Sequence, residues 1–203
     1  MRVSQEQFRS LSLEVHGILS DVPLHDVTAV DLPGGGAGRT ISDVRSLMAR
    51  ENLRAANPIV RVLFALRALL GRLFGWDSDR HTRQGTSYIH RLNNDIQRRS
   101  VLAPGAAEGT FRLLYVLDRE SLVEMHNATV HAFLSSVLVE TPSGYRLYWA
   151  VYVKPVSRLT PLYMALIEPF RRFIVYPAIF RRIRRAWEER YIRPLDSRAS
   201  KAV

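Results

Sequence analysis

The stretch that decides the fold runs from Arg146 to Lys154 and reads RLYWAVYVK. Its apolar side chains alternate with more polar ones, which is the pattern of a β-strand. The apolar face of this strand consists of Leu147, Trp149, Val151 and Val153. The opposite face carries Arg146, Tyr148, Tyr152 and Lys154. We therefore expect one face to pack against the protein and the other to meet water, as in antiparallel sheets.

Other segments around this strand also have strand character. Val27–Leu32 and Phe111–Leu117 alternate, and we expect one long strand over Leu122–Val139, bent near Asn127. The sequence Pro-Ser-Gly at 142–144 predicts a turn just before the deciding strand. Together these segments predict an antiparallel sheet.

The strand is followed by a long helix that contains Pro161, Pro169 and Pro177. A proline inside a helix removes one backbone hydrogen bond and bends the axis. The apolar arc of the helix rotates by roughly 100° after Pro177, counted at about 100° per residue. We expect a kink near Pro177 and expect Trp187 to pack on the body of the protein.

Helices are also expected before the sheet. An apolar period predicts one amphipathic helix over residues 5–19, and Thr40–Asp43 resembles a capping box that opens another. Asn57-Pro58 predicts the start of a third helix that runs to Phe74. The fold class is therefore α+β: an antiparallel sheet packed on a long kinked C-terminal helix, with additional N-terminal helices. We expect a single domain over 1–203, with a disordered tail over 195–203.

The composition excludes several classes of protein. Apolar residues make up 47% and charged residues 24% of the 203 positions, as in a folded globular domain. The chain has no cysteine, which excludes thiol catalysis, thiolate zinc sites and disulfides. We find neither a secretory signal nor about 20 uncharged residues in a row. We therefore expect a cytoplasmic protein that could touch the membrane periphery.

The positive charge is concentrated near the C-terminus. Residues 154–203 hold 12 basic and 4 acidic residues, and the rest of the chain holds 17 and 15. A membrane or partner-docking face is expected at Arg181, Arg182, Arg184 and Arg185. A solvated helix face in an arginine-rich composition is the alternative. Nucleic acid is not favoured.

The sequence shows no catalytic or cofactor motif. The loop at 33–40 reads PGGGAGRT and departs from both the P-loop and the dinucleotide-binding glycine patterns. His126 and His131 would point to opposite faces of one straight strand, and the other histidines form no ligand pair. We expect no metal, no cofactor and no catalytic residues.

Three segments resemble a known family. They are LFALRALLG at 63–71, FGW at 74–76 and above all LYMALIEPFRRFIV at 162–175. They resemble a bacterial domain family of unknown function, whose members occur alone or fused behind an epimerase-like NAD-binding domain. The resemblance covers most of residues 24–190 and implies the START-like helix-grip fold, in which a curved antiparallel sheet holds a long helix around an apolar cavity. Many members carry His in place of Arg171, and no nicotinamide chemistry carries over.

The expected function is non-enzymatic binding of an apolar or amphipathic small molecule between the sheet and the C-terminal helix. The expected lining consists of Tyr115, Phe133, Trp149, Tyr163, Leu166 and Phe170, each of which could instead be ordinary core. The alternatives are a peripheral membrane or partner-docking module and a cyclase- or hydrolase-like enzyme of START-like fold.

Arg67 is a further candidate for ligand binding. It falls inside the apolar arc of the helix expected over 58–74, where an unpaired guanidinium is costly to bury. Three outcomes stay open: Arg67 reaches the surface along its aliphatic stem, pairs with Glu124 or Glu168, or anchors a ligand anion.

Overall fold

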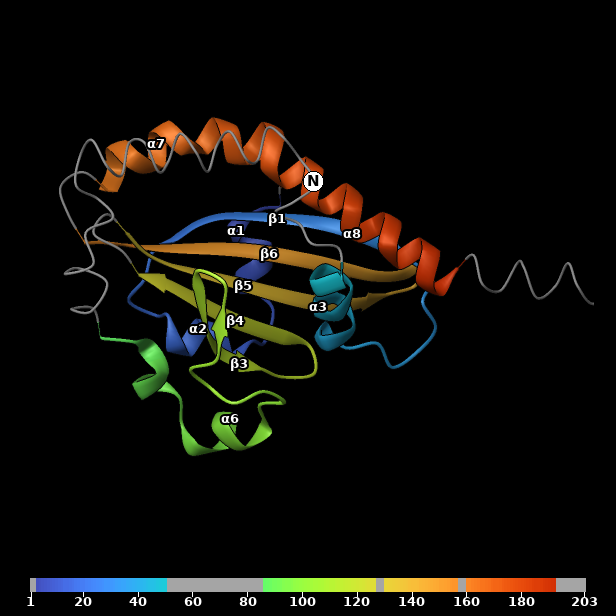
Figure 1. Cartoon of the computed structure of the whole chain (residues 1–203), viewed down its shortest axis with the longest axis horizontal. Coiled ribbons are helices and arrows are strands. Elements are labelled where there is room, and N and C mark those ends of the chain that lie inside the picture. Colours follow the sequence, from blue (N-terminus) through green and yellow to red (C-terminus); the bar gives the residue numbers. More distant parts are fainter. Residues whose placement is uncertain (1–2, 51–85, 127–129, 157–159, 193–203) are drawn as a thin grey trace, which may run out of the picture.

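The computed structural model describes residues 3–50, 86–126, 130–156 and 160–192. Its elements are α1 (Gln5–Arg9), α2 (Glu14–Ile18), β1 (Leu24–Pro33), α3 (Ile41–Arg50), η1 (Tyr88–Arg91), α6 (Asn94–Arg99), β2 (Ala107–Glu108), β3 (Phe111–Val116), β4 (Glu120–His126), β5 (Val130–Thr141), β6 (Gly144–Pro155), α7 (Thr160–Phe170), η2 (Arg171–Val175) and α8 (Tyr176–Tyr191). The six strands form one antiparallel sheet in the order β1-β6-β5-β4-β3-β2. The sheet curves beneath the long C-terminal helix (Figure 1). The expected α+β class is confirmed.

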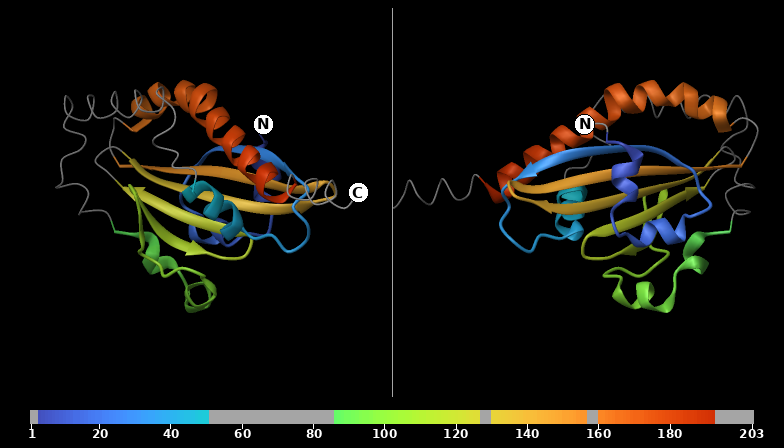
Figure 2. Two further views of the ribbon diagram at one scale, coloured as in Figure 1. Left: turned by 45° about the vertical axis from the view of Figure 1, so that its right-hand side comes forward. Right: turned by 180° about the vertical axis from the view of Figure 1, so that it is seen from behind.

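Helices cover both faces of the sheet, so the expectation of one water-facing side is wrong. Phe8 of α1 and Val15 of α2 pack against Tyr148 and Tyr152 of β6 in one core cluster, and both tyrosines are buried. On the other face, Trp149 belongs to a second cluster with residues of α3 and α8. The views from the front and from behind place α1 and α3 on opposite sides of the sheet (Figures 1 and 2). The amphipathic tyrosines on the polar-looking face of β6 are therefore core residues.

The N-terminal segment forms two helices rather than the single one expected over residues 5–19. Ser10 ends α1, and α2 begins at Glu14. The backbone N–H of Glu14 donates to Oε1 of Glu120 at 2.8 Å, so a carboxylate from β4 caps the new helix start. This partner is more than a hundred residues away, and a local period cannot reveal it.

The long strand expected over Leu122–Val139 is also wrong, because this segment is a hairpin. Strands β4 and β5 pair antiparallel, with His126 opposite His131. The two imidazole rings lie 4.8 Å apart, and His131 Nε2 lies 3.0 Å from Oε2 of buried Glu124. The two histidines are thus cross-strand neighbours, and the argument that separated them fails.

The C-terminal helix bends where the arc rotation predicted it. A π-helical turn, η2, precedes Pro177, and the helix changes direction between α7 and α8 (Figure 1). Such π-turns and prolines are the usual causes of kinks. Trp187 is fully buried, as expected. No described helix combines the length and the apolar character that crossing a bilayer requires.

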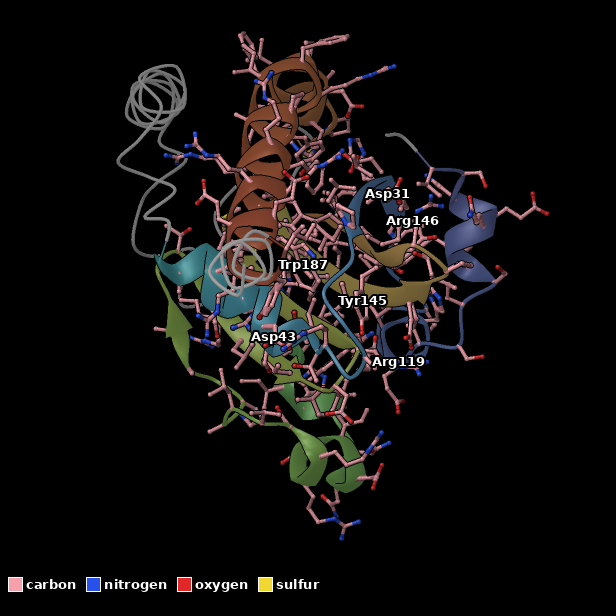
Figure 3. All side chains as sticks on the ribbon, turned by 90° about the vertical axis from the view of Figure 1, so that its right-hand side faces the viewer. Asp31, Asp43, Arg119, Tyr145, Arg146 and Trp187 are labelled. Atoms are coloured by element: carbon pink, nitrogen blue, oxygen red, sulfur yellow. The ribbon has the colours of Figure 1, made fainter. Side chains whose placement is uncertain are left out.

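The glycine-rich loop after β1 encloses Trp187. The indole N–H of Trp187 donates to the carbonyl of Pro33 at 2.9 Å, and the Tyr145 hydroxyl donates to the carbonyl of Gly36 at 2.8 Å. Gly35 has φ +96°, and a Cβ there would lie 2.5 Å from the indole ring. Figure 3 shows Trp187 beside Tyr145 at the end of α8. Close packing against the indole and positive φ values therefore account for the glycines.

Candidate functional site

A β-bulge at the start of β1 aims two consecutive side chains at the C-terminal helix. Leu24 pairs with Tyr152 and Asp26 pairs with Val151, so His25 is the extra residue. Leu24 and Val27 both pack in the cluster beneath α1 and α2. His25 and Asp26, the two residues between Leu24 and Val27, both contact the C-terminal helix. Bulges re-aim side chains in this way and are common next to functional sites.

The two side chains meet a set of polar groups from α7, η2 and α8. His25 Nε2 lies 2.5 Å from Oε2 of Glu168. Arg171 donates from a terminal nitrogen to Oδ2 of Asp26 at 2.7 Å and from Nε to the Tyr176 hydroxyl at 3.1 Å. That hydroxyl in turn donates to Oδ1 of Asp26 at 3.2 Å. We call these five residues the β1–helix cluster: His25, Asp26, Glu168, Arg171 and Tyr176.

Burial sets the proton affinities in this cluster. Asp26 is 8% exposed, and burial raises its pKa while the positive charge of Arg171 opposes the rise. Burial also raises the pKa of Tyr176, against the nearby charge of Arg171. Tyr176 is therefore a neutral hydroxyl at physiological pH, able to accept from Arg171 and donate to Asp26 at the same time.

The cluster contains a set of atoms that could ligate a metal. One ligand atom each from His25, Asp26 and Glu168 lies within 4.8 Å of the others. Nitrogen and carboxylate ligands of this kind suit zinc and related divalent ions. In the structure, however, the side chains of His25 and Glu168 pair with each other, and Asp26 forms an ion pair with Arg171. A cation would have to displace these partners.

A groove of about 550 Å³ runs from the cluster along the C-terminal helix. Strand β1 forms one wall with Asp26, Thr28, Ala29, Val30 and Asp31. The helix forms the other wall with Glu168, Arg171, Arg172, Phe173, Tyr176, Pro177, Phe180, Arg181 and Arg184. The groove therefore combines an apolar middle with charged groups at both ends.

The structure does not bring the expected lining residues together. Tyr115 and Phe133 are buried on the face covered by α1 and α2, across the sheet from the helix. The Tyr115 hydroxyl donates to Oε2 of Glu120 at 3.1 Å. These two residues therefore cannot line a cavity between the sheet and the C-terminal helix.

The remaining expected residues have mixed positions. Trp149 lies beneath the groove, with its ring 5.1 Å from that of Phe180. Leu166 is exposed, and Phe170 is half-buried outside the groove lining. Arg67 and the side chain of Tyr163 lie outside the described part of the structure.

Two of the four arginines of the expected docking face line the groove. Arg181 and Arg184 line the groove, whereas Arg182 and Arg185 do not. Arg184 and Arg185 form ion pairs with Glu188 and Glu189, each at 2.8 Å. Arg181, Arg184 and Arg185 are exposed, and the expected membrane or partner contact stays a prediction.

Sequence reasoning missed the β1–helix cluster. His25 and Glu168 are separated by 143 positions, and Asp26 and Arg171 by 145. No motif links positions so far apart. The one available signal was a charged Asp26 next to an otherwise apolar strand, which marks a buried polar site once the strand is known to be covered.

Searches for related proteins found a family but no characterised relative. No curated protein and no solved structure matches the chain. A protein-family model matches residues 18–178, a range that includes the bulge, the sheet, α7 and the start of α8. The chain therefore belongs to the family described as "Protein of unknown function (DUF2867)".

Proposed function

We propose that this protein binds an apolar or amphipathic small molecule in the groove between β1 and the C-terminal helix. The observation that carries the proposal is the groove itself. Its volume of about 550 Å³ lies within the range of small-molecule sites, roughly 300–1,000 Å³. Such sites have mostly apolar walls and a few polar groups that converge on the ligand.

The chemistry of the walls supports this proposal. Val30, Pro177 and Phe180 offer apolar contact in the groove, and Phe173 is 69% exposed. The exposed ring of Phe173 is a surface that a ligand would cover. Charged and polar groups flank this apolar surface toward both ends of the groove.

The arrangement also supports a relationship to START-like helix-grip proteins. In both, a curved antiparallel sheet holds a long C-terminal helix, and the ligand site lies between them. Here the site lies toward the β1 edge of the sheet, because Trp149 and Phe180 fill the space further in.

Native mass spectrometry of the purified protein tests the proposal first, by looking for a bound small molecule. A second test titrates the neutral dye Nile red, which fluoresces in apolar sites, into the wild type and Thr28→Trp. Thr28 lines the groove, so the indole should fill it and abolish dye binding. Thr110→Trp is the matched control, because Thr110 is exposed outside the groove.

The result that overturns the proposal is specific. If no small molecule is retained and Thr28→Trp binds the dye as strongly as the wild type does, the groove is not a ligand site. A dye signal lost equally in Thr28→Trp and Thr110→Trp would also count against it.

A further inference from the structure

We propose that the ligand of this groove is an anionic amphiphile, with its negative head at Arg181 and Arg184 and its apolar body toward Phe173. This inference rests on the proposed function and adds the charge and the orientation of the ligand. Three observations carry it: the partners of the charged groups, their distribution along the groove and the position of the exposed aromatic ring.

Every carboxylate that lines the groove already has a cationic or imidazole partner. Asp26 pairs with Arg171, Glu168 with His25, and Asp31 with Arg146, whose Nε lies 2.6 Å from Oδ1 of Asp31. Each of these carboxylates is therefore already engaged by a partner within the protein, which weakens its attraction for a cationic ligand.

The arginines of the groove are not matched in the same way. Four of them line it, against three carboxylates. Arg171 is held by Asp26, and Arg184 by Glu188. Arg172 and Arg181 form no ion pair with any of the residues that the structure describes. The groove thus has an excess of positive charge, which favours an anion.

The α8 end of the groove is the better place for that anion. Arg181 and Arg184 lie about one turn apart on α8, so their guanidinium groups can approach one ligand head. Arg172 lies nine positions before Arg181, about 13 Å along a helix. Two carboxylates, those of Asp26 and Glu168, line the groove near Arg171 and Arg172, whereas Asp31 is the one carboxylate of the groove lining that lies near Arg184.

The apolar body of the ligand then has a defined path. From Arg181 toward η2, the helix wall offers Phe180, Pro177 and the exposed ring of Phe173. The guanidinium of Arg172 lies 5.3 Å from the centre of the Phe173 ring. An alkyl chain or flat ring system along this wall would cover apolar surface that water now contacts.

The test compares three amphiphiles that differ in the head group alone: dodecanoate, 1-dodecanol and dodecylammonium. Each is titrated into the wild-type protein loaded with Nile red, at concentrations below micelle formation and at low ionic strength. We expect dodecanoate to displace the dye at a concentration about tenfold lower than dodecanol, from one charge-assisted contact. Dodecylammonium should be the weakest competitor.

Charge-removing variants locate the head group. Arg181→Gln should remove most of the preference for dodecanoate over dodecanol and leave dodecanol binding unchanged. Arg185→Gln is the matched control, because Arg185 lies on the same helix outside the groove lining. It should keep the full preference.

The outcomes separate this inference from the proposed function. If dodecanoate and dodecanol compete equally, or if Arg181→Gln and Arg185→Gln behave alike, the anionic assignment is wrong while the groove remains a ligand site. If none of the amphiphiles displaces the dye, both proposals fail. The last measurement is co-sedimentation of the protein with phosphatidylserine vesicles. If Arg181→Gln and Arg185→Gln reduce co-sedimentation equally, and the wild type shows no preference for dodecanoate, the arginines bind a membrane surface instead.

Discussion

The Tyr176 hydroxyl connects the side chains of Arg171 and Asp26 through hydrogen bonds. It accepts from Arg171 and donates to Asp26, which fixes both charged groups next to the groove. Hydrogen bonds to charged groups contribute about 1.5–3 kcal/mol each. We expect Tyr176→Phe to lower the free energy of unfolding by about 2 kcal/mol in urea titrations. Tyr191→Phe is the control, because within the described residues its hydroxyl bonds to Asp43 alone and is more exposed than that of Tyr176. A loss of similar size in Tyr191→Phe would contradict the argument.

Glu124 gives the protein a predicted dependence on acid. Burial by itself raises the pKa of this carboxyl, but hydrogen bonds from His131, Ser87 and the Tyr88 N–H outweigh burial and hold the pKa below its usual value. A lowered pKa means that the ionised form stabilises the fold. This stabilisation is present above the ordinary glutamate pKa of about 4.3 and is lost as pH falls below it.

The corresponding variant should remove that dependence. We expect the free energy of unfolding of Glu124→Gln to be about 2 kcal/mol below that of the wild type at pH 7, as measured by urea titration. At about pH 3 the two free energies should become similar, because the wild-type carboxyl is then largely protonated. Glu140→Gln removes an exposed carboxylate from β5 and should change neither value. A difference between wild type and Glu124→Gln that stays constant with pH would show that the ionised form is not what matters.

At the scale of elements, the contact between the glycine loop and α8 can be tested with two alanines. Gly35→Ala places a Cβ 2.5 Å from the Trp187 ring at a φ of +96°, so both strain and a clash result. We expect a loss of about 3 kcal/mol in the free energy of unfolding. Gly38→Ala has φ +77° but no atom within 4 Å, so it should cost only about 1 kcal/mol. Equal losses in urea titrations would mean that the indole does not set the requirement.

The elements predicted well are those specified by local pattern. The alternation of β6 placed Leu147 and Trp149 on one face, and both lie in the cluster beneath α8. The rotated arc after Pro177 predicted the kink and the burial of Trp187. In each case the periodicity of one segment carries the information, because its side chains meet a single partner surface.

The elements that were missed depend on distant partners. The β4–β5 hairpin read as one strand because both arms alternate and no Asn-Gly or Asp-Gly pair marks its turn. The covered face of β6 looked polar because Tyr148 and Tyr152 carry hydroxyls, and only α1 and α2 make them core.

The candidate site shows the same division. The groove lies between β1 and the C-terminal helix, and its lining includes Arg181 and Arg184, which the sequence had assigned to a docking face. Tyr115 and Phe133 were assigned to the wrong face, because a strand pattern gives alternation but not which side the long helix covers. The bulge at His25 was invisible, since one inserted residue changes the facing of Asp26 without changing the composition of β1.

Across the sheet, every central strand contributes side chains to both core clusters. In β6, Tyr148 packs toward α1 while the next residue, Trp149, packs toward α8. Loss of packing on one face therefore frees strands that the other face needs. We infer that the two cores unfold together, as small domains usually do.

Phe8 allows this coupling to be tested from the side opposite the tryptophan probes. Phe8 is the fully buried residue of α1, and Phe8→Ala should lower the free energy of unfolding by about 3–5 kcal/mol. In a Trp76→Phe background, fluorescence reports Trp149 and Trp187, which lie in the cluster on the other face. If the cores are coupled, the urea midpoints from fluorescence and from far-UV circular dichroism shift down together. Val101→Ala removes an exposed side chain and should shift neither. A fluorescence midpoint that stays at the wild-type value while the dichroism midpoint falls would show instead that the helix-covered face keeps its packing after the other is lost.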